Sequence, residues 1–126
     1  MPGIETRPKF LNLFQIHMPV GAVASIVHRI TGALLFFVMP SAVFLLELSL
    51  RSPEGFEQAQ AILQSPLAKL AGILVAWALL HHLLAGIRFL LLDCEIGISR
   101  ERARMTAWLV NFGAPVLLLI ILGLIL

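Results

Sequence analysis

The chain is predicted to be an all-α integral membrane protein, with three transmembrane helices that form part of a heteromeric helix bundle. Of its 126 residues, 60% are hydrophobic and only 13% are charged. A soluble domain of this length could not bury so much apolar side chain. Only helices and closed barrels satisfy the backbone in lipid. The long apolar runs lack the alternation typical of barrel strands, so helices are expected.

A single membrane-anchor domain, residues 1–126, is expected to contain a tail and three spans. The tail covers residues 1–19 and is expected to lie along the membrane surface until Pro19 opens the first helix. The three spans are expected at about 20–50, 66–93 and 106–126.

The segments between the spans carry recognisable local signals. Ser52-Pro53-Glu54 indicates the start of a short surface helix, and Ser65-Pro66 is typical of an N-cap followed by the first helical residue. Residues 94–105 are charged and are expected to form a connector. Pro40 lies inside the first span and is expected to kink it about one turn earlier.

The distribution of basic residues predicts the orientation of the chain in the membrane. Five of them belong to the tail and to the connector before the last span: Arg7, Lys9, Arg100, Arg102 and Arg104. Only Arg51 and Lys69 lie on the other side. The amino terminus is therefore expected in the cytoplasm and the carboxyl terminus in the periplasm. Basic residues this few and scattered do not support nucleic-acid binding.

A polar stripe opens the first span. Ser25, His28, Arg29 and Gly32 follow one another at helical spacing and share one face. Such a stripe cannot face lipid, because an unpaired charge in the hydrocarbon region is costly. It is therefore expected to face a protein partner, a cofactor or a water-filled cavity.

Arg29 has two alternative interpretations. It could form an ion pair with Asp93 that holds the first two spans together. Alternatively, Arg29 and His28 could meet an anionic cofactor group, or Arg29 could polarise a carbonyl oxygen while Ser25 donates a hydrogen bond nearby. A quinone head group fits the second alternative, because donors stabilise the negative charge that develops on its oxygens.

His82 is the candidate metal ligand of the second span. It precedes Asp93 by a helical distance of roughly 16 Å, which places it near the bilayer midplane. An imidazole at this depth could be an axial haem ligand or could make an interhelical hydrogen bond. The small residues nearby leave room for a macrocycle or allow close helix packing; they are Ala78, Ala85 and Gly86.

The two adjacent histidines cannot both bind one iron. His81 points roughly 100° away from His82 around the helix, so at most one of them is a ligand. His28 is expected nearer the cytoplasmic face than His82, which disfavours a pair of ligands within this chain. A second axial ligand is therefore expected from another subunit.

Four motifs carry a family resemblance: Arg7-Pro8, S-I-V-H-R-I-T-G at 25–32, S-P-E-G-F-E-Q-A at 52–59 and H-H-L-L-A-G-I-R-F-L-L-L-D at 81–93. With them, the chain resembles the cytochrome b membrane-anchor subunits of succinate dehydrogenase, the quinone-reducing respiratory complex II. The resemblance implies that His82 is the axial ligand of haem b. It also implies that His28 and Arg29 contact the haem propionates and that Ser25 and Arg29 belong to a ubiquinone site.

The resemblance also implies partners and a location. A flavoprotein subunit would oxidise succinate, and an iron–sulfur subunit would pass the electrons to quinone. A second small three-span anchor would share the haem and supply its other ligand, in a bacterial inner membrane. One departure is Phe89, where many relatives have histidine.

Three other functions remain open at this point. The chain could be a haem-free structural anchor whose histidines only make hydrogen bonds, or the anchor of a fumarate reductase. It could also belong to a small transporter, with Arg29 and Asp93 on an ion path. The transporter interpretation is weakened because the spans carry few further acids and no inverted repeat.

Overall fold

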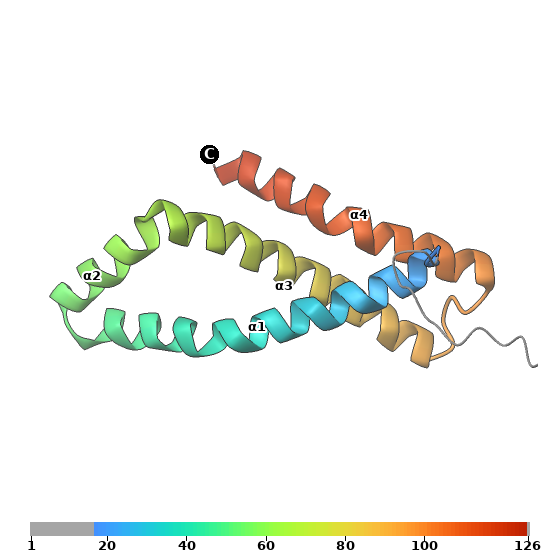
Figure 1. Cartoon of the computed structure of the whole chain (residues 1–126), viewed down its shortest axis with the longest axis horizontal. Helices are drawn as coiled ribbons and strands as arrows, with labels where there is room; N and C mark the ends of the chain where they lie inside the picture. Colours follow the sequence, from blue (N-terminus) through green and yellow to red (C-terminus); the bar gives the residue numbers. More distant parts are fainter. Residues whose placement is uncertain (1–16, 126) are drawn as a thin grey trace, which may run out of the picture.

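The computed structural model describes residues 17–125, and these form four helices (Figure 1). The helices are α1 (Val20–Arg51), α2 (Pro53–Gln64), α3 (Pro66–Asp93) and α4 (Arg100–Ile125). Three of them, α1, α3 and α4, are long and apolar enough to cross a membrane. The predicted all-α fold with three spans is confirmed. The predicted path of the tail over residues 1–16 lies outside the described residues.

The three long helices pack side by side, and α2 joins α1 to α3 at one end of the molecule (Figure 1). The start of α1, the end of α3 and the start of α4 lie together at the opposite end. Each of the long helices contacts both of the others. The chain therefore crosses the bundle three times in alternating directions.

The predicted starts of α2 and α3 are confirmed by their capping contacts. The Ser52 hydroxyl accepts a hydrogen bond of 3.1 Å from the Gly55 amide, and the Ser65 hydroxyl accepts one of 3.3 Å from the Ala68 amide. Each of these serines is followed by proline at the first helical position. Gly55 also allows α2 to approach α1, because a Cβ there would collide with the Leu48 carbonyl oxygen.

One expectation about the limits of the helices needs adjustment. The last helix begins at Arg100 and not at about residue 106, so half of the expected connector is helical. Ser99 starts it: its carbonyl accepts from the Ala103 amide at 2.9 Å, and its hydroxyl from the Arg102 amide at 3.4 Å. Charged residues can continue the helix here because its first turns extend beyond the apolar core of the span. Helix α1 continues past Pro40 without a break, and the kink expected one turn earlier stays a prediction.

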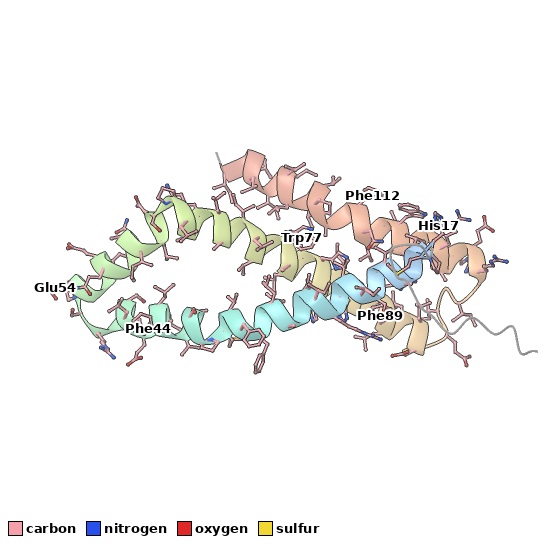
Figure 2. The ribbon with its side chains drawn as sticks, in the orientation of Figure 1. His17, Phe44, Glu54, Trp77, Phe89 and Phe112 are labelled. Atoms are coloured by element: carbon pink, nitrogen blue, oxygen red, sulfur yellow. The ribbon has the colours of Figure 1, made fainter. Side chains whose placement is uncertain are left out.

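The centre of the bundle is built from small residues. Five alanines are fully buried: Ala24, Ala78, Ala85, Ala107 and Ala114. Most large apolar side chains point outward instead, as Phe44 and Phe112 do at the periphery of the molecule (Figure 2). Small residues let membrane helices approach closely, while the outer apolar side chains meet lipid or other subunits.

Candidate functional site

His82 lies on the face of α3 that packs against α1. Its Nδ1 atom is 3.1 Å from the His28 carbonyl oxygen and 3.4 Å from the Thr31 hydroxyl. That hydroxyl donates to carbonyls of its own helix, so it can accept from the imidazole. A carbonyl oxygen only accepts, so Nδ1 must carry the ring proton. The Nε2 atom of His82 therefore holds the lone pair that could bind a metal.

His28 stacks on His82 across the α1–α3 contact. The two ring centroids are 4.1 Å apart and the ring planes differ by 9°. Thr31 contacts His82, whereas His28 lies against Gly86, one turn further along α3, so His28 is closer than His82 to the end of the bundle where α1 starts. The expectation that this end faces the cytoplasm stays a prediction. Two axial haem ligands lie on opposite sides of a macrocycle, and parallel rings at this separation leave no space for one between them. A second ligand from another subunit stays a prediction.

Two glycines give these imidazoles their space. A Cβ atom on Gly32 would lie 2.8 Å from Cε1 of His82, too close for the ring to stay in place. A Cβ atom on Gly86 would lie 3.6 Å from Nε2 of His28. Phe89 completes the cluster with its ring edge-on to His28 at 5.3 Å. The sequence indicated Gly32 only as a member of the polar stripe. The packing shows that its missing side chain makes room for the His82 ring.

Ser25 and Arg29 lie on α1 beside this cluster. Ser25 is half-buried and Arg29 is exposed, so both can be reached from outside the chain. The alternative of an Arg29–Asp93 ion pair is wrong, because the only ion pair within 4.0 Å among residues 17–125 joins Arg51 to Glu47.

The helix register explains why that pair does not form. Helices α1 and α3 run antiparallel. Thr31 contacts the His82 ring, and the Arg88 guanidinium reaches Gly21. By the Thr31–His82 contact, Asp93 lies level with the first residues of α1, more than two turns from Arg29, and it is exposed.

His81 points into the bundle and links all three long helices. Its side chain is 1% exposed, and its Nε2 atom lies 3.2 Å from Oδ1 of Asn111 on α4. The Asn111 amide nitrogen donates in turn to the Val20 carbonyl of α1 at 3.4 Å. Nδ1 of His81 is buried without a hydrogen-bond partner among the described residues. His81 therefore has no access to a cofactor outside the bundle, and His82 is the better-placed candidate.

Arg88 joins α3 to α4 and is only 8% exposed. Its Nε atom donates to the Thr106 hydroxyl at 3.1 Å, and its Nη2 atom donates to the Ala103 carbonyl at 3.0 Å. The guanidinium also lies 5.3 Å from the centre of the Phe89 ring. The sequence interpretation gave Arg88 no such role.

The inward face of α3 also changes the interpretation of its small residues. Ala78, His81, Ala85 and Arg88 form the buried stripe. Ala78 and Ala85 therefore serve close helix packing and do not open a space beside His82. The three- and four-residue spacing of this stripe was the signal that could have identified it from the sequence.

These features define a multi-pass helical membrane protein with one histidine sealed inside its bundle and two stacked at a helix–helix contact. Residues 4–122 match the model of the succinate dehydrogenase/fumarate reductase transmembrane subunit family, and the chain belongs to that family.

Similar proteins carry a more specific name. The chain is 39% identical over 115 residues to the succinate dehydrogenase cytochrome b556 subunit of Coxiella burnetii, a match that covers 88% of this chain and 92% of the relative. It is 32% identical over 111 residues to the subunit of the same name from Paracoccus denitrificans, covering 88% of this chain and 85% of the relative. A third such subunit, from Rickettsia conorii, is 31% identical over 111 residues, with 88% and 86% covered.

Proposed function

We propose that this chain anchors a succinate:quinone oxidoreductase in the membrane, binds haem b together with a second anchor subunit, and forms part of the ubiquinone-reduction site. The observation that carries the proposal is the His82 imidazole. Its Nδ1 atom is held by the His28 carbonyl, which orients the ring and leaves Nε2 as the metal-binding atom. The relatives named cytochrome b556 subunits support a haem of this type.

The residues beside His82 suit the rest of the haem. His82 would bind the iron through Nε2, and Arg29 and His28 would meet the propionates. The exposed Arg29 can pair with a carboxylate in a bidentate manner, which suits a propionate. The haem would supply one-electron redox chemistry, and its second ligand would come from the partner anchor.

The quinone site would use the accessible donors of α1. The Ser25 hydroxyl and the Arg29 guanidinium lie one helical turn apart on the same face. Both can donate hydrogen bonds to quinone oxygens and stabilise the negative charge that develops there during reduction. Other subunits would cover the exposed side of this α1 face and enclose the quinone.

The proposed complex also contains a flavoprotein subunit that oxidises succinate and an iron–sulfur subunit that delivers electrons to quinone. This chain would lie in a bacterial inner membrane with its amino terminus in the cytoplasm, on the side where the tail and connector carry more basic residues. The family description covers fumarate reductases too, so the opposite direction of electron flow is the alternative activity.

A haem-free anchor is the second candidate, and one observation favours it. The His82 ring makes a stacking contact and hydrogen bonds entirely within this chain, so it can stabilise the α1–α3 contact without any metal.

A reduced-minus-oxidised absorption spectrum of the assembled complex separates these candidates. His82→Gln is compared with His81→Gln, in which an amide can still reach Asn111. We expect a b-type signal in the wild type and in His81→Gln, and its loss in His82→Gln with the subunits still assembled. An unchanged signal in His82→Gln, or no haem in a quinone-active wild type, contradicts the ligand assignment.

The quinone assignment needs its own test. Ser25→Ala is expected to lower succinate:ubiquinone activity while succinate oxidation with a soluble artificial acceptor stays unchanged. Ser49→Ala is the control, since its hydroxyl only bonds the Leu46 carbonyl near the far end of α1. Equal quinone activity in the two variants contradicts a role for Ser25.

A further inference from the structure

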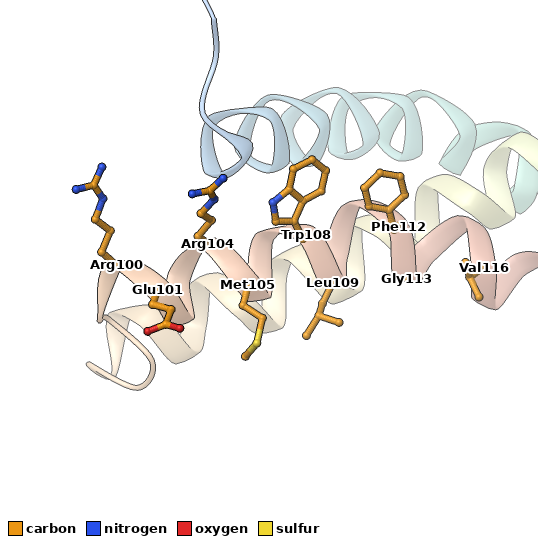
Figure 3. Close-up of a pocket in the computed structure, with 9 residues that line it drawn as sticks. All are labelled: Arg100, Glu101, Arg104, Met105, Trp108, Leu109, Phe112, Gly113 and Val116. Atoms are coloured by element: carbon orange, nitrogen blue, oxygen red, sulfur yellow. The ribbon is translucent and has the colours of Figure 1, made fainter.

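The outer face of α4 carries a ridge of two arginines followed by two aromatic residues. The ridge is Arg100, Arg104, Trp108 and Phe112, spaced four residues apart, so their side chains project to the same side (Figure 3). The Trp108 and Phe112 rings stack at 5.2 Å with an interplanar angle of 14°. The positive charge is thus confined to the end of α4 where the helix starts, and the aromatic part follows directly.

A groove lies on each side of this ridge. One has a volume of about 850 Å³ and continues past Leu109 and Gly113 to Val116. The other has a volume of about 680 Å³ and lies between α4 and the start of α1, where Val20 and Gly21 line it. All four residues of the ridge line both grooves.

The ridge spans the boundary between lipid headgroups and acyl chains. Helix α4 has 26 residues, which gives a length of about 39 Å against a hydrocarbon core of about 30 Å. Its first turns, with Arg100 and Arg104, therefore extend into the headgroup region. Trp108 then lies at the level typical of interfacial aromatic residues, and Val116 lies two turns deeper.

We propose that this face of α4 binds one anionic phospholipid. Its phosphate lies between the guanidinium groups of Arg100 and Arg104, which suit phosphate oxygens geometrically and electrostatically. Its two acyl chains follow the two grooves on either side of Trp108 and Phe112. The carboxylate of Glu101 points away from the arginines (Figure 3), and it disfavours a second anionic group on that flank.

Two features favour a lipid over an acidic segment of a partner protein. An acidic segment would satisfy Arg100 and Arg104, but it would not account for the apolar groove that continues past Leu109 toward Val116 at acyl-chain depth. The paired grooves also match the two chains of a phospholipid that share one headgroup. This site is independent of the proposed haem and quinone functions, which use the α1–α3 face.

Photo-crosslinking in nanodiscs tests the proposal. The chain, with the subunits that copurify with it, is placed in phosphatidylcholine discs containing a small fraction of diazirine-labelled phosphatidylglycerol or diazirine-labelled phosphatidylcholine. Labelled peptides of α4 are then quantified by mass spectrometry. The double variant R100Q/R104Q is compared with R102Q, which removes an exposed arginine of the same turn that lines neither groove.

We expect α4 to be labelled preferentially by phosphatidylglycerol. Each arginine near an anionic lipid contributes about fivefold in affinity, so the preference should fall by about 25-fold in R100Q/R104Q and should persist in R102Q. Labelling of α2 by phosphatidylcholine serves as the measure of correct insertion. If the double variant does not assemble, Gly113→Leu fills the larger groove without changing any charge, and it should lower labelling around Val116.

Three outcomes overturn the proposal. The first is equal labelling of wild-type α4 by the two lipids. The second is a loss in R102Q as large as in R100Q/R104Q, which would indicate a general surface charge effect. The third is protection of α4 from both lipids with crosslinks to a protein subunit instead, which would make this face a protein interface.

Discussion

Gly32→Ala tests how tightly His82 is seated against α1. The new Cβ atom would lie 2.8 Å from Cε1 and 3.3 Å from Nδ1 of His82. Ordinary van der Waals contact begins at 3.4 Å, so the ring must move by about 0.6 Å. That movement lengthens the 3.1 Å hydrogen bond from Nδ1 to the His28 carbonyl and disturbs the stacked rings.

The free energies can be compared term by term. Overpacking of this kind costs about 1–3 kcal/mol, and a weakened hydrogen bond costs about 0.5–1.5 kcal/mol. Replacing glycine by alanine inside a helix stabilises the helix by about 1 kcal/mol, which offsets part of this loss. We therefore expect Gly32→Ala to lower the stability of the anchor by about 0.5–3.5 kcal/mol.

The assay is thermal unfolding of the detergent-solubilised complex, with the haem spectrum recorded in parallel. Gly72→Ala on α3 is the matched control, because a Cβ atom there meets no atom within 4 Å. It should be neutral or slightly stabilising. A Gly32→Ala protein as stable as Gly72→Ala, with the same spectrum, would refute the argument that His82 is held against Gly32.

Three further predictions concern other contacts. Asn111→Leu leaves Nε2 of the buried His81 without an acceptor and should destabilise the anchor by about 1–3 kcal/mol in thermal unfolding. The double variant with His81→Leu should lose less stability than the sum of the losses in the two single variants. Arg88→Met removes two hydrogen bonds to α4 and should raise the rate of proteolysis in the α3–α4 connector. The Glu54 carboxyl accepts hydrogen bonds from the Glu54 backbone amide and from the Ser52 hydroxyl, and these lower its pKa. The ionised carboxylate therefore stabilises the start of α2 at pH values above its unfolded-state pKa. This stabilisation is lost as the pH falls through the lower folded-state pKa. Amide exchange in α2 should accordingly speed up in acid relative to the bundle, and this pH dependence should be absent in Glu54→Gln.

Each of these predictions has a contradicting result. Additive losses in the double variant would show that His81 and Asn111 do not interact. An Arg88→Met protein that is cleaved no faster than Arg102→Met would show that the buried hydrogen bonds do not hold α4. For Glu54, the same pH dependence of α2 exchange in the wild type and in Glu54→Gln would assign the effect to another group.

The sequence by itself was enough to determine the class of the protein and the limits of most helices. Three apolar stretches of membrane-spanning length require helices in lipid, and this holds whatever the helices pack against. The starts of α2 and α3 follow from Ser52-Pro53 and Ser65-Pro66, because capping contacts involve only residues within one turn. The start of α4 was missed, because charges outside the bilayer do not end a helix.

Only the tertiary structure decided which side of each helix faces inward. Helix α3 is apolar on nearly every side, and in lipid that pattern does not distinguish an inner face from an outer one. Packing turns His81 toward Asn111 and leaves His82 at the α1 contact. The register between α1 and α3 is likewise set by close contacts between distant residues, and it stacks His28 on His82 while separating Arg29 from Asp93.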